Sequence, residues 1–215
     1  MTFLEIINGV LSRLREQTVT TNLETDYSIL SGLLVNDAKN QVEQAHEWTA
    51  LRKTIEFSTV VGTTTYSLTS AYQSAILKCA INTGNKTYLR QQTKDWMNDR
   101  TVLNTAATGE PTSFAYMGTD ANNYLQVQLY PTPDKIQTIK FDMVVPQADL
   151  SDDTTQLTIP SQPIIQLAFA MALRERGETG GISAQEQFAV AQRSLGDAIA
   201  IDANKYPEEL VFYSV

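Results

Sequence analysis

The chain has 215 residues, of which 24 are acidic, 16 are basic, one is His and one is Cys. Hydrophobic residues make up 42% and charged residues 19%, so the composition supports a buried core and argues against wholesale disorder. The net charge of −8 argues against a free-standing nucleic-acid binder, which needs a large basic surface to neutralise phosphates. A single Cys excludes an internal disulfide, and one His with one Cys excludes the usual closed zinc sites. We therefore expect no metal ion and no cofactor.

No stretch reaches the roughly 20 apolar residues that span a bilayer. The apolar N-terminal stretch 1–14 is interrupted by Glu5, Asn8 and Arg13 and indicates an amphipathic helix rather than a signal peptide. We therefore expect a soluble protein with no membrane partner. At roughly 100–200 residues per domain, the length allows one large domain or a small domain with a sizeable insertion.

The first 50 or so residues have the periodicity of helices. Phe3, Ile7 and Val10 lie on one face of the first, and Thr2 with Glu5 three residues later predicts a capping box at its start. A polar break at 18–26 separates it from a second apolar stripe, long enough for about five turns. The members of that stripe are Leu30, Leu34, Ala38, Val42, Ala45 and Trp48.

Alternation of apolar and polar side chains predicts strands from about 54 to 160. The segment 82–85, Asn-Thr-Gly-Asn, predicts a hairpin because Asn and Gly tolerate positive φ. The run 91–100 predicts a short helix that carries Trp96. Two further strands, 124–130 and 138–145, flank a Pro-rich turn, and we expect them to form a second hairpin.

Helical periodicity returns from 161 to about 205. Pro163 suits a first helical position, and the helix that follows is apolar nearly all round. We expect this helix at the centre of the core. After the break at 177–181, a last helix presents one apolar face, formed by Phe188, Ala191, Leu195, Ala198 and Ile199.

This order of elements predicts an α+β fold. We expect the N- and C-terminal helix pairs to form one four-helix bundle, from which a β-rich insertion domain projects. The bundle would comprise residues 1–53 and 161–205, the insertion residues 54–160, and a C-terminal tail residues 206–215.

Few side chains offer the chemistry of an active site. Cys79 lies within a predicted strand and His46 beside an apolar stripe, and lone residues in such places are typically structural. A glycosidase needs one carboxyl group in a desolvated pocket, and no carboxylate here is marked in that way. The densest acidic group lies in a segment typical of turns and comprises Asp149, Asp152 and Asp153.

The charge balance reverses between residues 78 and 100. This stretch contains only two acids, Asp95 and Asp99, but five cations, namely Lys78, Lys86, Arg90, Lys94 and Arg100. These cations form either a DNA-facing patch or an ordinary solvated sheet face. If the chain formed a ring, a weak basic patch repeated in every copy would attract DNA through the summed electrostatic field of all copies.

The C-terminal tail is rich in apolar side chains, although little chain remains to fold it into a core. An exposed apolar cluster of that size is a liability unless a partner covers it. The tail either packs back as a final strand or docks onto another chain by strand addition. Its candidate contact residues are Tyr206, Pro207, Leu210, Val211, Phe212, Tyr213 and Val215.

Several motifs follow one another in a recognisable order between Gly109 and about Glu178. Gly-Glu-Pro-Thr at 109–112 precedes Leu-Tyr-Pro-Thr-Pro-Asp at 129–134, which is followed by the strand 139–146, by Ile-Pro-Ser-Gln-Pro at 159–163 and by an Ala-rich helix. The sequence Gly-Thr-Thr-Thr-Tyr-Ser-Leu at 62–68 and the N-terminal helix pair agree with the same order. It resembles the head-to-tail adaptor, or connector, proteins of tailed phages, a family similar to tail tubular protein A of short-tailed phages.

The resemblance implies a structural virion protein and not an enzyme. It implies a homo-oligomeric ring, typically a dodecamer, that is assembled in the host cytoplasm and lies in the neck of the virion. The ring would join the portal protein to the tail nozzle protein, with genome DNA passing through its centre. It also implies that the helices contact neighbouring subunits and that the tail reaches the portal, which favours docking over packing back.

Two alternative functions remain. A virion-associated peptidoglycan hydrolase would need acid and base carboxylates, for which Glu110 and Asp152 are the first candidates. A DNA-binding module would use the basic patch between residues 78 and 100.

Overall fold

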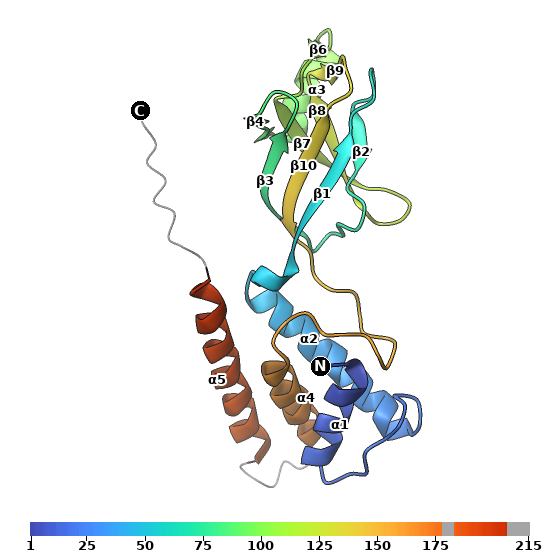
Figure 1. Ribbon diagram of the computed structural model, residues 1–215, viewed down its shortest axis with the longest axis vertical. Helices are drawn as coiled ribbons and strands as arrows, with labels where there is room; N and C mark the ends of the chain where they lie inside the picture. The colour runs from blue at the N-terminus through green and yellow to red at the C-terminus, as the bar shows by residue number, and fades with distance from the viewer. Residues whose placement is uncertain (178–182, 206–215) are drawn as a thin grey trace. The chain divides into compact units, whose positions relative to one another are not determined.

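The computed structural model describes residues 1–177 and 183–205 (Figure 1). The chain forms two compact units, the first from Met1–Leu51 with Gln147–Val215 and the second from Arg52–Pro146. Both ends of the chain thus contribute to the first unit, and the segment between them forms the second. Within the described residues, no helix combines the length and apolar character that a membrane span requires.

The first unit is helical. The predicted capping box at its first helix is confirmed: the Thr2 amide donates to Glu5 Oε2 at 2.9 Å, and the Glu5 amide donates to Thr2 Oγ1 at 3.2 Å. These two bonds satisfy backbone donors that a helix start would otherwise leave unpaired. The elements are α1 (Phe3–Arg13), α2 (Asp26–Ala45), the 3-10 turn η1 (Thr49–Leu51), α4 (Ser161–Glu175) and α5 (Ser183–Ala203).

Helices α1, α2 and α4 contact one another, whereas α5 packs beside α4 (Figure 1). The apolar helix predicted at the centre of the core is confirmed as α4, in which Ile164, Ala168 and Ala172 are fully buried. The predicted four-helix bundle with a β-rich insertion domain is wrong. Along the described part of α5 only Ala191 and Asp202 are buried, so this helix does not close a common core. The described chain is instead α+β, with five α-helices and about ten strands in three sheets.

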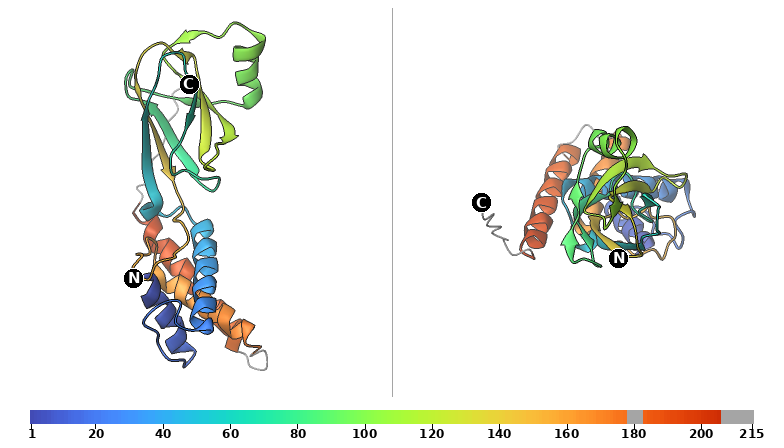
Figure 2. Two further views of the ribbon diagram at one scale, coloured as in Figure 1. Left: turned by 90° about the vertical axis from the view of Figure 1, so that its right-hand side faces the viewer. Right: turned by 90° about the horizontal axis from the view of Figure 1, so that it is seen from above.

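The second unit contains the strands. Its first sheet is antiparallel in the order β1 (Arg52–Ser58), β10 (Thr138–Val144), β3 (Ile76–Asn82) and β4 (Thr87–Tyr88). Its second sheet has the order β2 (Thr65–Ser67), β8 (Leu125–Tyr130), β7 (Ser113–Thr119) and β5 (Arg90–Gln91). A small third sheet pairs β6 (Thr108–Gly109) with β9 (Thr132–Pro133). Helix α3 (Lys94–Asn98) and the π-helical turn η2 (Asp99–Leu103) lie outside the strands of the second sheet (Figure 2).

One of the two predicted hairpins is present. Strands β3 and β4 pair across 83–86, with Asn82 opposite Thr87, which confirms the first. The second is wrong, because β8 pairs with β2 and β7 whereas β10 pairs with β1 and β3. Both strands turn apolar side chains into one core, so they face each other from different sheets rather than lying edge to edge. Helix α3 confirms the short helix predicted around Trp96.

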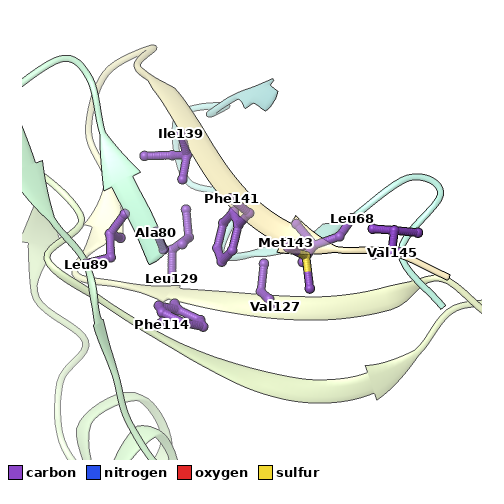
Figure 3. Close-up of a cluster of buried hydrophobic side chains, with 11 residues drawn as sticks. Leu68, Ala80, Leu89, Phe114, Val127, Leu129, Ile139, Phe141, Met143 and Val145 are labelled. Atoms are coloured by element: carbon purple, nitrogen blue, oxygen red, sulfur yellow. The ribbon is translucent and has the colours of Figure 1, made fainter. Parts of the chain in front are cut away.

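The core of the second unit lies between its two large sheets. Phe141 and Met143 of β10 point toward Val127 and Leu129 of β8 (Figure 3). The Phe141 ring lies edge-on to that of Phe114 on β7, with centroids 5.1 Å apart. Full burial of an apolar side chain of this size contributes about 1.5–3 kcal/mol, so this layer holds the two sheets together.

A strap of residues 147–158 connects β10 to α4 and is held by polar side chains of α2. The Asn36 amide group donates to the Leu150 carbonyl at 3.0 Å and accepts from its amide at 2.8 Å. One turn further along the helix, Lys39 Nζ donates to the Gln147 carbonyl at 2.7 Å and lies 3.2 Å from Glu43 Oε2. Lys39 has no exposed side-chain surface. Side chains three and four residues apart on a helix share a face, which is why these residues reach the same strap.

Candidate functional site

A shallow pocket of about 300 Å³ lies on the first sheet. Strands β1, β10 and β3 lie side by side there, and their register sets Thr54 opposite Asp142 and Asp142 opposite Cys79. The pocket is lined by Arg52, Lys53, Thr54, Lys78, Cys79, Asp142 and Met143. Three cations, one hydroxyl group, one thiol and one carboxylate therefore meet at one place.

Asp142 forms the polar centre of this pocket. Its Oδ1 accepts a hydrogen bond from the Thr54 hydroxyl at 2.5 Å, and its Oδ2 accepts one from the Cys79 thiol at 3.2 Å. Burial raises the pKa of Cys79 to about 11, and the hydrogen bond to Asp142 and the charge of Asp142 act in the same direction. A thiol with such a pKa stays protonated at neutral pH, whereas a nucleophilic cysteine is a thiolate.

A β-bulge brings Lys78 to the same pocket. Leu77 is opposite Met143 and Cys79 is opposite Asp142, so Lys78 is the extra residue of β3. Bulges of this kind change the direction of a side chain without ending the sheet. Two residues along β10 from Asp142, Lys140 forms an ion pair with Glu56 at 2.6 Å on the same face.

The five cations predicted between 78 and 100 are spread over several elements of the second unit. Of these, only Lys78 lines the pocket, where its neighbours are Arg52 and Lys53. Arg100 lies 5.2 Å above the Trp96 ring and 3.9 Å from Asp99. The elements that carry them are β3 for Lys78, the β3–β4 turn for Lys86, β5 for Arg90, α3 for Lys94 and η2 for Arg100.

Of the two candidate carboxylates of a hydrolase, Glu110 is engaged in a local ion pair. Glu110 pairs with Lys135, and hydrogen bonds from Lys135 and Asn85 lower its pKa. A general acid needs a raised pKa, which is the opposite shift. In the strap, the carboxylate of Asp153 accepts a hydrogen bond from the Asn22 amide at 2.8 Å, whereas the neighbouring Asp152 accepts one from the Thr155 amide at 2.9 Å through its backbone carbonyl.

Asp149 is also used within the strap. Its Oδ1 accepts from the Asn40 side chain at 3.3 Å and lies 3.9 Å from Lys39 Nζ. In the ranges 1–177 and 183–205, no group of three or more His, Cys, Asp or Glu side chains is placed to hold a metal ion.

A buried carboxylate holds the end of α5 to the loop that follows α2. Asp202 is only 3% exposed. Its Oδ2 accepts from the Thr49 amide at 2.9 Å and lies 3.2 Å from His46 Nε2. Its Oδ1 accepts from the Thr49 hydroxyl and from Lys205 Nζ, the latter at 2.9 Å.

The electrostatics of Asp202 follow from these donors. Burial alone would raise its pKa, but the hydrogen bonds from Thr49 and Lys205 outweigh it and lower the pKa to about 2. The carboxylate is therefore ionised over the whole physiological range. It fixes the point from which residues 206–215 continue, and the predicted contact residues Tyr206, Pro207, Leu210, Val211, Phe212, Tyr213 and Val215 lie outside the described residues.

The outer surfaces of α2 and α5 expose large apolar side chains. Leu33 is 61% exposed, one turn from the exposed Ile29. On α5, Ile201 is 67% exposed and Val190 is also exposed. Exposed apolar side chains gathered on particular helix faces mark surfaces that bind other molecules more often than scattered ones do.

Sequence reasoning missed three of these features. The Lys39–Glu43 pair has the spacing of four residues that signals an ion pair on a helix, but its burial has no sequence signal. Asp202 is the single acid in the stretch 198–203, which otherwise consists of Ala and Ile. A lone acid in such a stretch is a signal that could have identified Asp202 as a residue that holds the end of the helix. The sequence does not show that Arg52 and Lys78 line the same pocket, because that follows from the position of β10 between their two strands.

Comparison with known proteins identifies the chain at the level of a family. No curated protein matches the sequence. Residues 1–209 match the protein family described as SU10 adaptor protein. This supports the predicted resemblance to a phage adaptor, whereas similarity to tail tubular protein A is not part of the match. Because the match covers nearly the whole sequence, the chain belongs to the SU10 adaptor protein family and is a phage structural adaptor, a component of the virion.

Proposed function

We propose that this adaptor forms a dodecameric ring that joins the portal protein to the tail nozzle protein and surrounds the genome DNA in its channel. The observation that carries the proposal is the adaptor family match over residues 1–209. An adaptor acts by binding other virion components, which requires surfaces for neighbouring copies and for each partner. Portal, nozzle, further copies of the chain and DNA are therefore the proposed partners.

The first unit supports the proposal with surfaces that suit neighbouring copies. The exposed apolar side chains on α2 and α5, such as Leu33 and Ile201, gain about 25 cal/mol for each Å² that an adjoining subunit covers. A closed ring uses two different surfaces of each copy in head-to-tail contact. Two apolar helix faces on one unit meet that requirement.

The charge of the chain supports passage of DNA rather than tight binding of DNA. Contacts between cations and phosphates hold proteins on DNA, and the net charge of −8 limits such contacts. A channel that DNA must leave quickly benefits from few strong phosphate contacts.

The tail supplies the proposed contact with the portal. It continues from α5, the end of which Asp202 fixes to the first unit. Ten residues span at most about 35 Å when fully extended, so the segment 206–215 can reach a partner well beyond the helix end. Its apolar side chains, among them Val211 and Phe212, would gain free energy where a partner covers them.

Removing residues 206–215 is expected to weaken portal binding by tenfold or more. One large apolar side chain buried on a partner contributes about 1.5–3 kcal/mol, and about 1.4 kcal/mol corresponds to a factor of ten in affinity. Binding of the full chain and of the chain ending at residue 205 to purified portal is compared by surface plasmon resonance. The free energy of unfolding should be the same for both.

A point variant separates the tail's apolar contacts from its charge. Phe212→Asp should weaken portal binding in the full chain, whereas Glu208→Gln serves as the matched control and should bind as the unmodified chain does. Unchanged affinity of the truncated chain for the portal would show that the tail is not the portal contact.

A further inference from the structure

We propose that the open edge of β1 binds segment 206–215 of a second copy of the chain, which adds to the first sheet as a further strand until portal protein displaces it. Among the described residues, β1 pairs with β10 alone, so one side of its backbone faces away from the sheet. The other edge strands, β2, β4 and β5, have three residues or fewer. Only the displacement by portal protein rests on the proposed function.

The alternation of hydrogen bonds along β1 identifies the backbone groups that are open. The amide of Thr59, the residue after the strand, donates to the Gln137 carbonyl at 2.8 Å. In an antiparallel pair every second residue bonds to the neighbouring strand, and the residues between point away from it. The amides of Thr54, Glu56 and Ser58 therefore point away from β10. With the carbonyl groups of the same residues, they are what an added strand bonds to.

The side chains in the middle of β1 leave this edge accessible. Thr54 donates to Asp142, and Glu56 forms an ion pair with Lys140 at 2.6 Å. Both partners belong to β10, so the two side chains lean toward β10 and away from the open edge. Proteins commonly block an exposed edge with Pro or with charges that project over it. β1 contains no Pro, and the charge at its centre is held on the other side.

The core of the second unit is incompletely covered next to this edge. Ile55 and Phe57 of β1 pack against the core but are only half-buried, whereas Ile139 and Phe141 opposite them on β10 are fully buried. The Phe57 ring stacks on that of Tyr66 on β2, with centroids 4.7 Å apart. An added strand with apolar side chains would extend this layer and gain free energy from the apolar area it covers.

The segment 206–215 has the length and composition of a strand for this edge. Pro207 cannot donate to a ladder, so we place the added strand after it. Beyond Glu208 seven residues remain, 209–215, and β1 also has seven. Most of these are Val, Leu or aromatic residues, and Val, Phe and Tyr favour strands. The residues 206–208 are left to connect the strand to the end of α5.

The antiparallel order of the first sheet favours a second copy over the same chain. Asp202 holds the end of α5 at Thr49, three residues before β1 begins. A segment that left from there and paired with β1 of its own chain would run in the same direction as the strand. The described strands of this sheet are antiparallel throughout, and parallel pairing is slightly less stable for each residue. A second copy can supply the segment in the antiparallel direction.

One segment cannot pair with β1 and bind the portal at the same time. Pairing between copies covers its apolar side chains while portal protein is absent, and an uncovered apolar cluster is a liability for a free chain. Portal binding then removes the segment and leaves the β1 edge open again.

The first test measures hydrogen exchange of the backbone amides of residues 54, 56 and 58 by NMR, in the full chain and in two full-length variants. Exchange slows about tenfold when about nine-tenths of the edges are covered. We expect this slowing in the unmodified chain and in Glu208→Gln, and fast exchange in Phe212→Asp. The slowing should disappear on dilution, because pairing between copies depends on concentration. Adding portal protein should also restore fast exchange.

The second test mixes two variants of the full chain. Isotope-labelled Phe212→Asp offers an open edge, and unlabelled Glu56→Pro offers an intact segment but lacks the central donor of its own edge. We expect the mixture to slow exchange at residues 54, 56 and 58 of the labelled copy, and unlabelled Phe212→Asp to have no such effect. Glu56→Gln, which also loses the ion pair with Lys140, should show the slow exchange of the unmodified chain. Thermal unfolding confirms that each variant is folded.

Two results would overturn the proposal. The first is equally fast exchange at these amides in the unmodified chain and in Phe212→Asp at the highest concentration. The second is slow exchange that survives dilution and is not restored by mixing, which would place the segment on β1 of its own chain. Portal binding keeps this proposal separate from the proposed function. Glu56→Pro should bind portal at least as tightly as the unmodified chain, and slow exchange would remain if the segment were not the portal contact.

Discussion

Lys39→Met is expected to lower the free energy of unfolding of the first unit by about 3–5 kcal/mol at neutral pH. That is the usual effect of removing one partner from a buried ion pair. Lys39 is fully buried, and its ammonium group contacts Glu43 Oε2 and the Gln147 carbonyl. The variant leaves a desolvated carboxylate without its cation and a strap carbonyl without its donor. Urea unfolding followed by circular dichroism measures the loss.

Two further variants show whether the loss has this cause. Lys39→Met/Glu43→Leu removes both charges and should regain most of the lost stability, because replacing a buried pair by apolar groups is often neutral. Glu16→Gln removes the more exposed pair with Arg176 in the same unit and should change stability by less than about 1 kcal/mol. If Lys39→Met lost no more stability than Glu16→Gln, the buried pair would not be what holds the strap.

The loss in Lys39→Met should shrink on acidification. Burial already raises the pKa of Glu43, and Lys39 is the strongest influence that lowers it. Without Lys39 the pKa of Glu43 in the folded state rises further above its unfolded value of 4.5. A raised carboxyl pKa means that the folded state binds the proton more tightly. The extra stability that this tighter proton binding gives the folded state is complete below about pH 4.5, and it is lost as the pH rises through the folded-state pKa of Glu43.

Asp202→Asn is expected to lower the free energy of unfolding by roughly 2 kcal/mol at pH 7. The pKa of Asp202 falls from 3.8 to about 2 in the folded protein, and one pKa unit corresponds to about 1.4 kcal/mol. Because this pKa is lowered, the contribution is complete above pH 3.8 and is lost as the pH falls through about 2. The unmodified chain should therefore approach the variant in stability as the solution is acidified. Urea unfolding at pH 7 and at pH 3 measures this.

Asp197→Asn is the matched control, because Asp197 is exposed on the same helix. It should be nearly neutral at both pH values. Asp202→Asn should also loosen the end of α5 from Thr49 and His46 and so increase hydrogen exchange there. Equal stabilities of the two variants at pH 7 would contradict an anchoring role for Asp202.

The parts of the fold that could be predicted from the sequence are those set by neighbouring residues. Thr2 and Glu5 mark the start of α1 because a capping box needs only residues three apart. The Asn and Gly residues at 82–85 mark the β3–β4 hairpin because turn geometry is local. The continuous apolar character of α4 identifies the centre of the first unit because no other environment accommodates it.

The parts that could not be predicted depend on partners distant in sequence. Strands 124–130 and 138–145 have the alternation of a hairpin, but alternation does not say whether two strands lie side by side or face each other across a core. The apolar face of α5 has the periodicity of a core helix, but periodicity does not say how deeply a face is covered, and Phe188, Leu195 and Ile199 are only half-buried. The pocket could not be predicted for the same reason. It exists because β10 lies between the strands that carry Arg52 and Lys78, and no local sequence pattern indicates that strand order.

Imaging the purified chain mixed with its portal protein by electron microscopy tests the central claim most directly. The proposed function predicts particles in which a ring of this chain is stacked on the portal, with a continuous channel along the common axis. Portal particles without added density, in the presence of excess folded chain, would contradict it.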